Sequence, residues 1–383
     1  MSALSICHVL WSVEIGGAER VVLDLAKVQK AAGHRVAVLT LSNPDGALSG
    51  EMRQVVDTLD SVPKRARGLD PTLPFRLARW FRAHRAEVVH THNELPLIYG
   101  APGGKMAGAR VVHTKHGIVG VTRGAHWLRR AAARCVDSFV AVSAATADTA
   151  RAQHECVPRT LSVVINGADL SRFPAPAGAR EAVRRELGVP LDARVLISIG
   201  RLVKEKNHAL LLRAAAPLLR EDRRLIIVGD GALRDALGAQ VRGMDAGRYV
   251  HMTGARRDVP ALLAAADAFV FSSDSEGLPI GLIEAWAAGL PVVSTAVGGI
   301  VVAVEDGVTG LLVPPGDEPA LSAGLRRAFD GDALFASMAR RVRTHALGTY
   351  SAERMADAYF DLYRQLRRQP PSSAGSANFR IGP

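Results

Sequence analysis

Two glutamates stand eight positions apart in the segment SSDSEGLPIGLIEAWAAGLPVVST, residues 272–295, which is otherwise largely apolar. Glu276 precedes a short apolar stretch that we expect to be helical, and Glu284 lies inside that stretch. A buried carboxylate without a partner is costly, so two acids in such a segment indicate a functional role. The alternative is one glutamate that caps a helix and a second one that is solvated.

Two cations flank a turn in IGRLVKEKNH, residues 199–208. Arg201 and Lys206 follow a strand-like stretch and precede a helix-like one. At the carboxyl end of a strand that faces a cleft, two such cations suit a diphosphate group. A solvated basic loop is the alternative.

A glycine pair in IGGAER, residues 15–20, follows the first expected strand and opens a helix. Gly16 and Gly17 would let the backbone approach a ligand closely, and a helix N-terminus favours an anion. An ordinary tight turn between strand and helix is the alternative. The stretch lacks the GxGxxG pattern, and the second strand ends without the acid that would hold an adenosine ribose, so we do not expect a nicotinamide-dependent oxidoreductase.

Four histidines stand at the ends of two expected strands, in VVHTHN (88–93) and VVHTKHG (111–117). They are His90, His92, His113 and His116. No carboxylate partner or HExxH pattern accompanies them, so a metal site is not expected. Such a histidine can contact a substrate hydroxyl or can be a hydrogen-bonded residue at the end of a strand. For His90 and His113 we expect the second.

Strand-like and helix-like stretches alternate along the chain, which predicts parallel sheets with helices on both faces. The expected strands are LSICHVLWS, RVAVLTLS, EVVHTH, RVVHTKH and SFVAVS in the first half, and RVLISIGR, RRLIIVGD, YVHMTG, AFVFSS and PVVST in the second. Residues 166–180 are rich in Pro, Ala and Gly, which indicates a linker. We therefore predict an α/β protein of two doubly wound domains, residues 1–170 and 171–350, that face a cleft. Residues 351–368 have helical spacing, and residues 369–383 have the composition of a disordered tail.

The composition is that of a globular chain, with 383 residues of which 48% are hydrophobic. The three cysteines form no CxxC pair, which is typical of free thiols in a reducing compartment. The first apolar stretch has no basic region before it and runs into a glycine turn, so we expect a strand there and no signal peptide. No apolar run reaches the roughly 18 residues that span a bilayer, and we expect a cytoplasmic protein.

The net charge of +11 is concentrated in the first half of the chain. Residues 1–185 hold 25 Lys and Arg against 15 Asp and Glu, whereas residues 186–383 hold 23 against 22. A positive field of this kind attracts the phosphates of nucleic acid or of anionic lipid. Within it, the stretches 74–89 and 123–135 combine arginines with aromatic residues at helical spacing. Their candidate surface residues are Arg76, Arg79, Trp80, Arg82, Trp127, Arg129 and Arg130, with Arg123 at the start of the second stretch.

Two interpretations of this basic surface stay open. In the first, the apolar side of each helix packs on a sheet and the arginines are solvated. In the second, the surface docks to anionic lipid at the inner face of the membrane and contacts an acceptor presented there. Each basic residue close to such a surface adds about 1 kcal/mol, so several would suffice for reversible attachment.

Five motifs follow one another in the second half: GRLVKEKNH, LIIVGDGALRDAL, HMTGARRDVPALLAAADAFVFSS, SEGLPIGLIEAWAAGLPVVST and EDGVTGLLVPPGD. In this order they resemble the donor domain of the retaining glycosyltransferases of family 4, which have the GT-B fold. Glu276 and Glu284 match the E-x7-E element of that family. IGGAER, the HTH at 90–92, TKHG and INGAD stand at comparable places in the first half, so the resemblance covers roughly residues 5–368.

The resemblance implies a transferase that moves a hexose-type sugar, with retention and without a metal ion or other cofactor. The donor would be a nucleoside-diphosphate sugar, with a UDP-sugar expected first and GDP-mannose second. The acceptor would be a polysaccharide, a lipopolysaccharide or a lipid-linked glycan. The second domain would bind the donor and the first the acceptor, and the last helix would cross back to the first domain.

For the phosphates, the resemblance implies that Arg201 and Lys206 neutralise the leaving diphosphate. Gly16 and Gly17 belong to a loop that would close over the phosphates. His116 would approach the sugar from the first domain, near the reacting carbon.

For the sugar, the resemblance implies that Glu276 lies beside it, with the backbone amides of Gly277 and Leu278 nearby. Glu284 would accept hydrogen bonds from the ribose hydroxyls. The two acids of the opening segment would thus be two hydroxyl acceptors spaced along one nucleotide sugar.

The chain departs from the family at one loop. After Gly298-Gly299-Ile300 the family often has a Pro-Glu pair, where this chain has Val301 and Val302. We expect that loop to border the donor pocket, so the two valines bear on donor preference and rate.

Two other functions stay open. One is a nucleotide-sugar epimerase of the same fold, which would release a free, altered sugar. The other is a non-enzymatic basic module that binds nucleic acid through the first half. No nucleic-acid motif is recognised and aromatic residues make up 5% of the chain, so nucleic acid is not an expected partner.

Overall fold

A computed structural model describes residues 3–117, 126–331 and 333–368 of the chain. The tail predicted at 369–383 and Arg123 of the second basic stretch lie outside these residues. None of the helices within them is both long and apolar enough to cross a bilayer.

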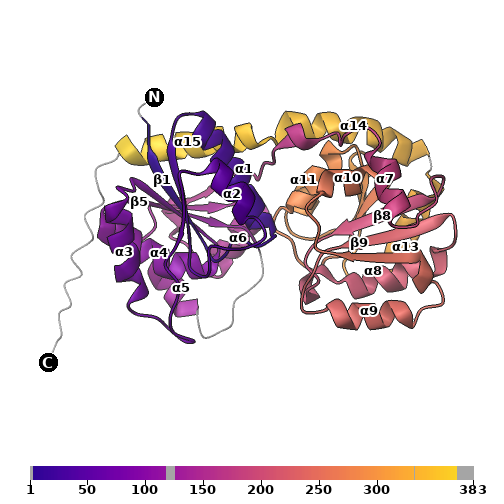
Figure 1. Ribbon diagram of the computed structural model, residues 1–383, viewed down its shortest axis with the longest axis horizontal. Coiled ribbons are helices and arrows are strands. Elements are labelled where there is room, and N and C mark those ends of the chain that lie inside the picture. The colour runs from indigo at the N-terminus through magenta and orange to yellow at the C-terminus, as the bar shows by residue number, and fades with distance from the viewer. Residues whose placement is uncertain (1–2, 118–125, 332, 369–383) are drawn as a thin grey trace.

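Two parallel sheets form the framework, one in each half of the chain (Figure 1). The first has seven strands in the order β3-β2-β1-β4-β5-β6-β7 and the second has six in the order β10-β9-β8-β11-β12-β13. The strands of the first sheet are β1 (Ser5–Leu10), β2 (Arg35–Thr40), β3 (Thr58–Ser61), β4 (Val88–His92), β5 (Arg110–Lys115), β6 (Ser138–Ala141) and β7 (Leu161–Val163). Those of the second are β8 (Arg194–Ile199), β9 (Arg223–Val228), β10 (Val250–Gly254), β11 (Ala268–Phe271), β12 (Val292–Thr295) and β13 (Gly310–Val313).

The strand order of both sheets reverses beside the first strand, between β1 and β4 and between β8 and β11. This is the topology of doubly wound α/β domains, and it places a crevice at the carboxyl ends of the strands. The predicted fold class is therefore confirmed.

The sequence pattern misses three strands, β3, β7 and β13. All three lie at the edge of a sheet. An edge strand pairs on one side only, so its residues are less buried and its apolar pattern is weak. In β3 every residue is half-buried, and β7 has no buried residue.

Helices cover both faces of each sheet, as predicted. In the first half they are α1 (Gly17–Ala31), α2 (Ser49–Val55), α3 (Leu73–Ala83), α4 (Glu94–Ala107), α5 (His126–Ala133) and α6 (Ala144–Ala152). In the second half they are α7 (Ala179–Glu186), α8 (His208–Ala215), α9 (Arg234–Arg242), α10 (Val259–Ala264), α11 (Ile280–Ala287), α12 (Ile300–Ala303), α13 (Glu318–Asp330), α14 (Ala333–Thr349) and α15 (Ala352–Arg368). Short 3-10 turns are η2 (Pro158–Thr160), η3 (Leu170–Arg172), η4 (Lys204–Lys206), η5 (Ala216–Leu218) and η6 (Gly247–Tyr249).

The side chains of β1 show how the first sheet is covered on both faces. Ile6 packs in a cluster with residues of α1 and α15, whereas Cys7 and Val9 pack in a cluster with residues of α3. Successive side chains of a strand point to opposite faces, so α1 and α15 lie on one face and α3 on the other.

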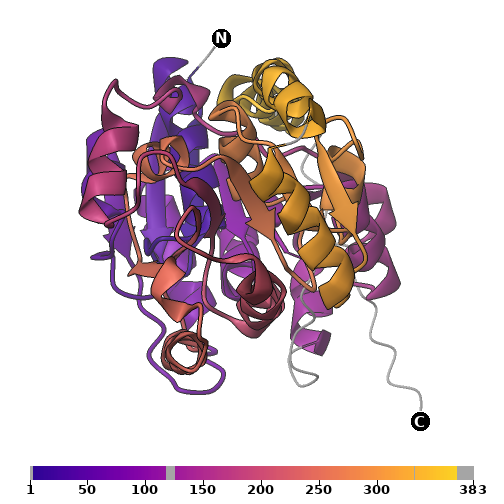
Figure 2. The same cartoon turned by 90° about the vertical axis from the view of Figure 1, so that its right-hand side faces the viewer.

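The two C-terminal helices connect the halves. Helix α14 packs on α11 in the second half, and α15 packs on α1 in the first. Figures 1 and 2 show both helices, in yellow, along the same side of the molecule. Two tyrosines of α15 bond to the first sheet, Tyr359 to Thr114 at 2.8 Å and Tyr363 to His90 at 2.7 Å. The predicted crossing of the last helix back to the first domain is confirmed.

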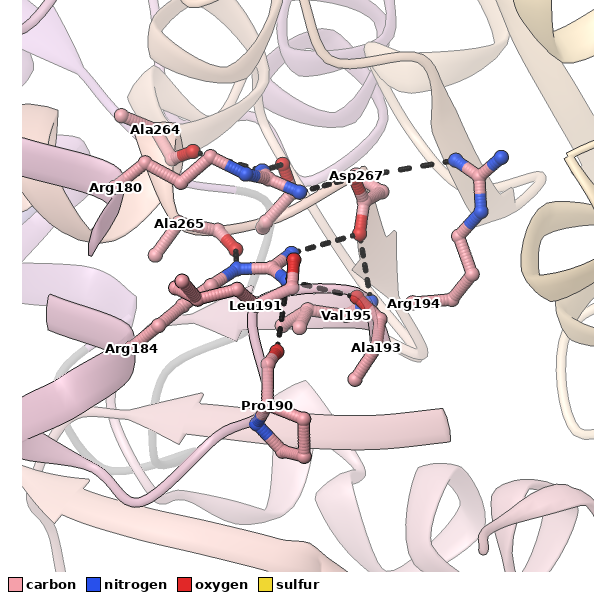
Figure 3. A network of polar contacts seen from close by, with 11 residues as sticks. Arg180, Arg184, Pro190, Leu191, Ala193, Arg194, Val195, Ala264, Ala265 and Asp267 are labelled. Atoms are coloured by element: carbon pink, nitrogen blue, oxygen red, sulfur yellow. Dashed lines mark hydrogen bonds and ion pairs between the residues drawn. The ribbon is translucent and has the colours of Figure 1, made fainter. Parts of the chain in front are cut away.

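A buried arginine fixes α7 to the second sheet (Figure 3). The side chain of Arg184 is fully buried and makes an ion pair of 3.1 Å with Asp267, which also accepts a hydrogen bond of 2.8 Å from the amide of Val195 in β8. Its Nε donates to the backbone carbonyl of Ala265, and its Nη1 donates to those of Pro190, Leu191 and Ala193. One side chain thus binds three carbonyls between α7 and β8 and the carbonyl of Ala265 at the end of α10.

Replacing this arginine should destabilise the second half strongly. For Arg184→Met we expect the free energy of unfolding to fall by about 3–5 kcal/mol, because Asp267 and the carbonyls would remain buried without a partner. Urea denaturation followed by circular dichroism would measure the loss. Arg180→Met is the matched control, since Arg180 also pairs with Asp267 but is partly exposed, and it should cost about 1 kcal/mol or less. Equal losses in the two variants would contradict this account.

Candidate donor and acceptor cleft

A cleft of about 1080 Å³ lies between the carboxyl ends of the two sheets. Its walls come from segments that follow β1, β4 and β5 in the first half and β8, β9, β10 and β11 in the second. All residues predicted for donor binding or catalysis line it: Gly16, Gly17, His116, Arg201, Lys206, Glu276, Gly277, Leu278 and Glu284. The parallel topology therefore brings together residues that are up to 268 positions apart in the sequence.

Lys206 and Glu276 form an ion pair in the cleft, with 2.5 Å between Nζ and Oε1. Lys206 ends the turn η4 after β8, and Glu276 lies in the loop after β11. The same carboxylate oxygen accepts a hydrogen bond of 2.7 Å from the hydroxyl of Ser273. The hydroxyl of Ser272 donates to the backbone carbonyl of Lys206 at 3.0 Å, so the two loops hold each other in place.

Arg201 is exposed to the cleft and faces the first half. Burial raises the pKa of Glu19, which lies in the first turn of α1, and the positive charge of Arg201 opposes this rise. Glu19 also lines the cleft. Sequence reasoning missed this residue, although it lies within the quoted IGGAER motif.

Glu284 is buried in α11 at the bottom of the cleft. Burial raises its pKa to about 7, and the positive charges of Arg172 and Arg20 oppose the rise. Arg172 makes an ion pair of 3.4 Å with Glu284. Arg172 belongs to the predicted linker, where composition alone gave no sign of a functional side chain.

Gly277 touches the first half through its backbone. A Cβ atom at this position would lie 2.4 Å from the carbonyl oxygen of His116, so only glycine fits here. A Cβ atom at Gly299 would in turn lie 1.8 Å from the carbonyl oxygen of Gly277. Next to it, the carbonyl of Leu278 accepts a hydrogen bond of 3.0 Å from the side chain of Asn166.

Val301 and Val302 turn their side chains to solvent rather than into the cleft. Their loop contacts the cleft segment at Gly277 through Gly299. The side chains of Val301 and Val302, however, are 50% and 71% exposed. Neither valine is among the described residues that line the cleft. They lie on the short helix α12, which turns their side chains to solvent. The loop therefore contacts the cleft segment at Glu276 and Gly277, as expected, but the two valine side chains do not line the cleft.

His116 is held at the cleft by two neighbours. Its Nε2 lies 2.9 Å from Nδ1 of His92, and its backbone amide donates to the side chain of Asn93 at 3.3 Å. Asn93 has a φ of +63°, a strained conformation for a residue other than glycine. Burial lowers the pKa of His116 to about 3, so the ring is neutral at physiological pH.

His90 and His113 are hydrogen-bonded residues of their strands, as expected. His90 bonds to Tyr363 and to Thr114, both at 2.7 Å, and His113 bonds to the hydroxyl of Thr91 at 3.0 Å. Ring nitrogens of His8, His90 and His92 lie within 4.8 Å of one another, a spacing that would also be considered for a metal ion. Each of these nitrogens also has a hydrogen-bond partner among the described side chains.

A second charged group lines the cleft on the side of the first half. Lys115 and Arg129 both bind Glu155, and the Nε atom of Arg129 lies 3.6 Å from Glu94. Arg129 is only 4% exposed, so it does not belong to an exposed membrane-docking surface, whereas its place in the cleft leaves the predicted acceptor contact open. It faces the cleft because α5 turns this side chain toward the buried Glu155.

The basic surface of α3 and α5 is partly occupied by internal contacts. Arg76 pairs with Asp70 at 2.8 Å, and the indole N–H of Trp80 donates to Asp60 at 2.7 Å. Both side chains are thus engaged within the protein and are not available to bind a membrane surface. The exposed residues are Phe75 and Trp127, at 66% and 63%, together with Arg79, Arg82 and Arg130.

Two family models match the chain, one in each half. Residues 15–172 match Glycosyltransferase Family 4, and residues 179–345 match Glycosyl transferases group 1. Among curated relatives, a D-inositol 3-phosphate glycosyltransferase of Kineococcus radiotolerans is 31% identical, over 95% of this chain and 93% of that protein. The UDP-Gal:alpha-D-GlcNAc-diphosphoundecaprenol alpha-1,3-galactosyltransferase of Escherichia coli is 25% identical, over 94% of this chain and 97% of that protein.

Solved structures share the fold. Anabaena Alr3699/HepE in complex with UDP-glucose superimposes with a TM-score of 0.83 at 22% identity, over 94% of this chain and all of that chain. A glycosyltransferase from Rickettsia africae superimposes with a TM-score of 0.82 at 18% identity, over 97% of this chain and all of that chain.

Proposed function

Because the chain belongs to glycosyltransferase family 4 and has the GT-B fold of that family, we propose that it transfers a hexose from a UDP-sugar to a glycan or lipid-linked acceptor, with retention of configuration and without a metal ion. The observation that carries the proposal is the convergence of Arg201, Lys206, Glu276 and Glu284 in one cleft. These are two cations for a diphosphate and two carboxylates for hydroxyl groups, all contributed by the second half.

The cations account for the departure of the nucleotide. In the transfer, the bond between the anomeric carbon and the diphosphate breaks, and a bond from that carbon to the acceptor oxygen forms. Lys206 and Arg201 stabilise the negative charge that develops on the diphosphate, and preorganised charges of this kind supply a large part of catalysis. The N-terminus of α1, which begins at Gly17, adds its dipole on the opposite side of the cleft.

The proton balance follows from the direction of attack. The acceptor hydroxyl approaches the same face of the sugar that the diphosphate leaves, which retains the configuration. The departing phosphate oxygen accepts the proton of that hydroxyl. Lys206 is already paired with Glu276, so the carboxylate is held in place to accept hydrogen bonds from the sugar hydroxyls.

The donor proposal rests on the charges of the cleft and on the relatives. The relative from Escherichia coli is named for UDP-Gal, and the structural neighbour from Anabaena holds UDP-glucose. These names favour a UDP-sugar over GDP-mannose. The two cations supply the charge that a divalent ion supplies in metal-dependent transferases, and this supports metal independence.

The acceptor proposal rests on the wall formed by the first half. Trp11 follows β1 and is 43% exposed in the cleft, where its flat indole offers a stacking surface for a sugar ring. Its backbone carbonyl is fixed by two hydrogen bonds from Ser42, of 3.0 Å from the amide and 2.7 Å from the hydroxyl. Among the relatives, one is named for a diphosphoundecaprenol-linked acceptor and one for lipopolysaccharide core biosynthesis in Rhizobium meliloti.

Calorimetric titration with UDP, GDP, UDP-glucose, UDP-galactose and GDP-mannose, all in EDTA, tests the donor site. We expect saturable binding of the uridine nucleotides, and about 10- to 100-fold weaker binding by Lys206→Ala because a charge-assisted hydrogen bond is lost. In addition, Glu276→Ala and Lys206→Ala should each abolish transfer while leaving the circular dichroism spectrum unchanged.

Lys204→Ala is the matched control for this titration. Lys204 belongs to the same turn as Lys206, is exposed, and is not one of the described residues that line the cleft, so its removal should leave the affinity unchanged. Normal turnover by Lys206→Ala would contradict the site. No binding of any nucleotide would contradict the donor proposal and favour the basic-module alternative. A free epimerised sugar among the products would favour the epimerase alternative.

The ionisation of Glu284 should make donor binding depend on pH. With a pKa raised to about 7, the carboxyl is about one tenth ionised at pH 6 and about nine tenths ionised at pH 8. If the ionised form accepts the ribose hydroxyls, the affinity for UDP-glucose should rise up to about tenfold from pH 6 to pH 8. The diphosphate of UDP-glucose does not titrate in this range, so any change in affinity between the two pH values comes from ionisation of the protein. Glu284→Gln should remove most of the rise, and an unchanged rise in that variant would contradict the assignment.

We propose further that the exposed face of α3 and α5 docks to anionic lipid. Both helices contact α4, which lies between them on one side of the first sheet (Figure 1). Phe75 and Trp127 can enter the headgroup region while Arg79 and Arg130 meet the phosphates.

Sedimentation with vesicles that contain phosphatidylserine tests this docking. The variant with Phe75→Ala, Trp127→Ala, Arg79→Ser and Arg130→Ser should bind at least tenfold less, because each basic residue contributes about 1 kcal/mol. The control combines Leu191→Ala and Arg242→Ser, which remove an exposed leucine and an exposed arginine from the other half. Equal binding by the wild type and the four-site variant would show that the arginines are only solvated.

A further inference from the structure

A row of buried side chains leads from the interior of the first domain to the cleft. The carbonyl oxygen of the Gln29 side chain lies 2.8 Å from Nε2 of His8. Nδ1 of His8 lies 3.0 Å from Nε2 of His92, and Nδ1 of His92 lies 2.9 Å from Nε2 of His116. Gln29 comes from α1, His8 from β1, His92 from β4, and His116 follows β5. The row ends at Nδ1 of His116, a buried atom that has no hydrogen-bond partner among residues 3–117, 126–331 and 333–368.

The orientation of the Gln29 amide, which places its oxygen towards His8, determines where the protons of this row lie. A neutral imidazole has one N–H and one lone pair, so each ring can donate once and accept once. The carbonyl oxygen of Gln29 can only accept, so His8 carries its proton on Nε2 and accepts at Nδ1. His92 must then donate from Nε2, and His116 must donate from Nε2. The Nδ1 atom of His116 is therefore left with a lone pair.

The packing around the row favours neutral, fixed rings. Gln29, His8 and His92 are at most 1% exposed, between the first sheet and the helices that cover it. Burial lowers the pKa of His8 to about 4 and that of His92 well below its usual range. The ring of His90 packs on both, with centroid distances of 5.1 Å to His8 and 4.2 Å to His92.

The unpartnered end of the row lies on a ring that lines the cleft. Leaving a buried acceptor without a hydrogen bond costs about 1–3 kcal/mol, so such an atom at the wall of a ligand cleft calls for a donor from the ligand. A sugar hydroxyl is such a donor. Because the ring nitrogen can only accept, the row also determines which kind of ligand group suits this position.

We propose that Gln29, His8 and His92 are positioning residues that fix the ring orientation and the tautomer of His116, so that its Nδ1 accepts a hydrogen bond from a hydroxyl of the transferred sugar. The proposal rests on the proposed transferase function of the cleft. It extends the site into the domain core, to residues that no ligand can touch. Hydrogen-bond partners that orient metal-bound histidines contribute about 10- to 100-fold to metal affinity or activity, and we expect an effect of the same order here.

Variants at His8 separate the hydrogen bond from packing. His8 is not one of the described residues that line the cleft, so it acts on bound sugar only through the row. In His8→Leu the row is cut, and we expect the kcat for UDP release from UDP-galactose or UDP-glucose to fall about 10- to 100-fold with little change in KM. In His8→Asn the side-chain oxygen takes the place of Nδ1 and accepts the hydrogen bond from Nε2 of His92, so kcat should stay within about threefold of the wild type.

The control is His34→Leu. His34 is also a buried histidine of the first domain, with Nδ1 bonded to the amide of Leu4 at 3.1 Å and its ring against Phe360 of α15. It has no part in the row, so its loss should leave kcat unchanged. Wild-type kcat in His8→Leu would overturn the proposal, and so would equal losses in His8→Leu and His8→Asn, which would indicate packing alone.

Nitrogen NMR of protein labelled with 15N-histidine gives a readout that does not depend on turnover. The signals of His116, identified by their absence in His116→Asn, should show one neutral tautomer with the proton on Nε2. In Gln29→Met, which removes the fixed acceptor and keeps the volume, they should show both tautomers. This variant also tests the row if His8→Leu does not fold. A cationic His116, a proton on Nδ1, or an unchanged single tautomer in Gln29→Met would overturn the proposal.

The turnover assay tests the proposed transferase function, and the NMR spectra test the role of the row in fixing the tautomer of His116. If wild-type protein releases no nucleotide from UDP-glucose, UDP-galactose or GDP-mannose, the proposed function fails. The NMR signals of His116 still decide whether the row fixes its tautomer.

Discussion

The parallel direction of the strands is the constraint on which the rest of this structure depends. Parallel strands end on the same side of a sheet, so every loop that follows a strand contributes to one edge. Two such edges face each other here, and the loops after β1, β5, β8 and β11 therefore meet in a single cleft. This is why a glycine turn, a histidine, a lysine and a glutamate from distant parts of the chain can act on one ligand.

Several charged side chains of the cleft are paired with one another before any ligand is bound. Lys206 is paired with Glu276, Arg172 with Glu284, and Lys115 and Arg129 with Glu155. Pairing offsets the cost of burying each charge and fixes its position. A cleft organised in this way needs little rearrangement when charge develops on a leaving group, and this is the condition for electrostatic catalysis.

The C-terminal helices join the two walls of the cleft mechanically. Helix α14 packs on α11, which carries Glu284, while the tyrosines of α15 bond to His90 and Thr114 beside the histidine row. Helix α11, which holds Glu284, and the polar side chains behind His116 therefore belong to one packed unit. The apolar core agrees, because one cluster contains Leu25 of α1, Ile283 of α11 and Phe360 of α15.

The sequence by itself determined the fold class, ten of the strands and nine of the residues that line the cleft, because apolar periodicity and local motifs are properties of neighbouring residues. Three edge strands escaped it, since half-buried strands leave a weak pattern. Tertiary structure alone decided the partners: that Arg172 of the linker meets Glu284, that Arg129 is buried, and that Val301 and Val302 face solvent. It also decided that His8, His92 and Gln29 line up behind His116. Contacts of this kind depend on the order of strands in a sheet and on which helix covers which face, and no local pattern contains that information.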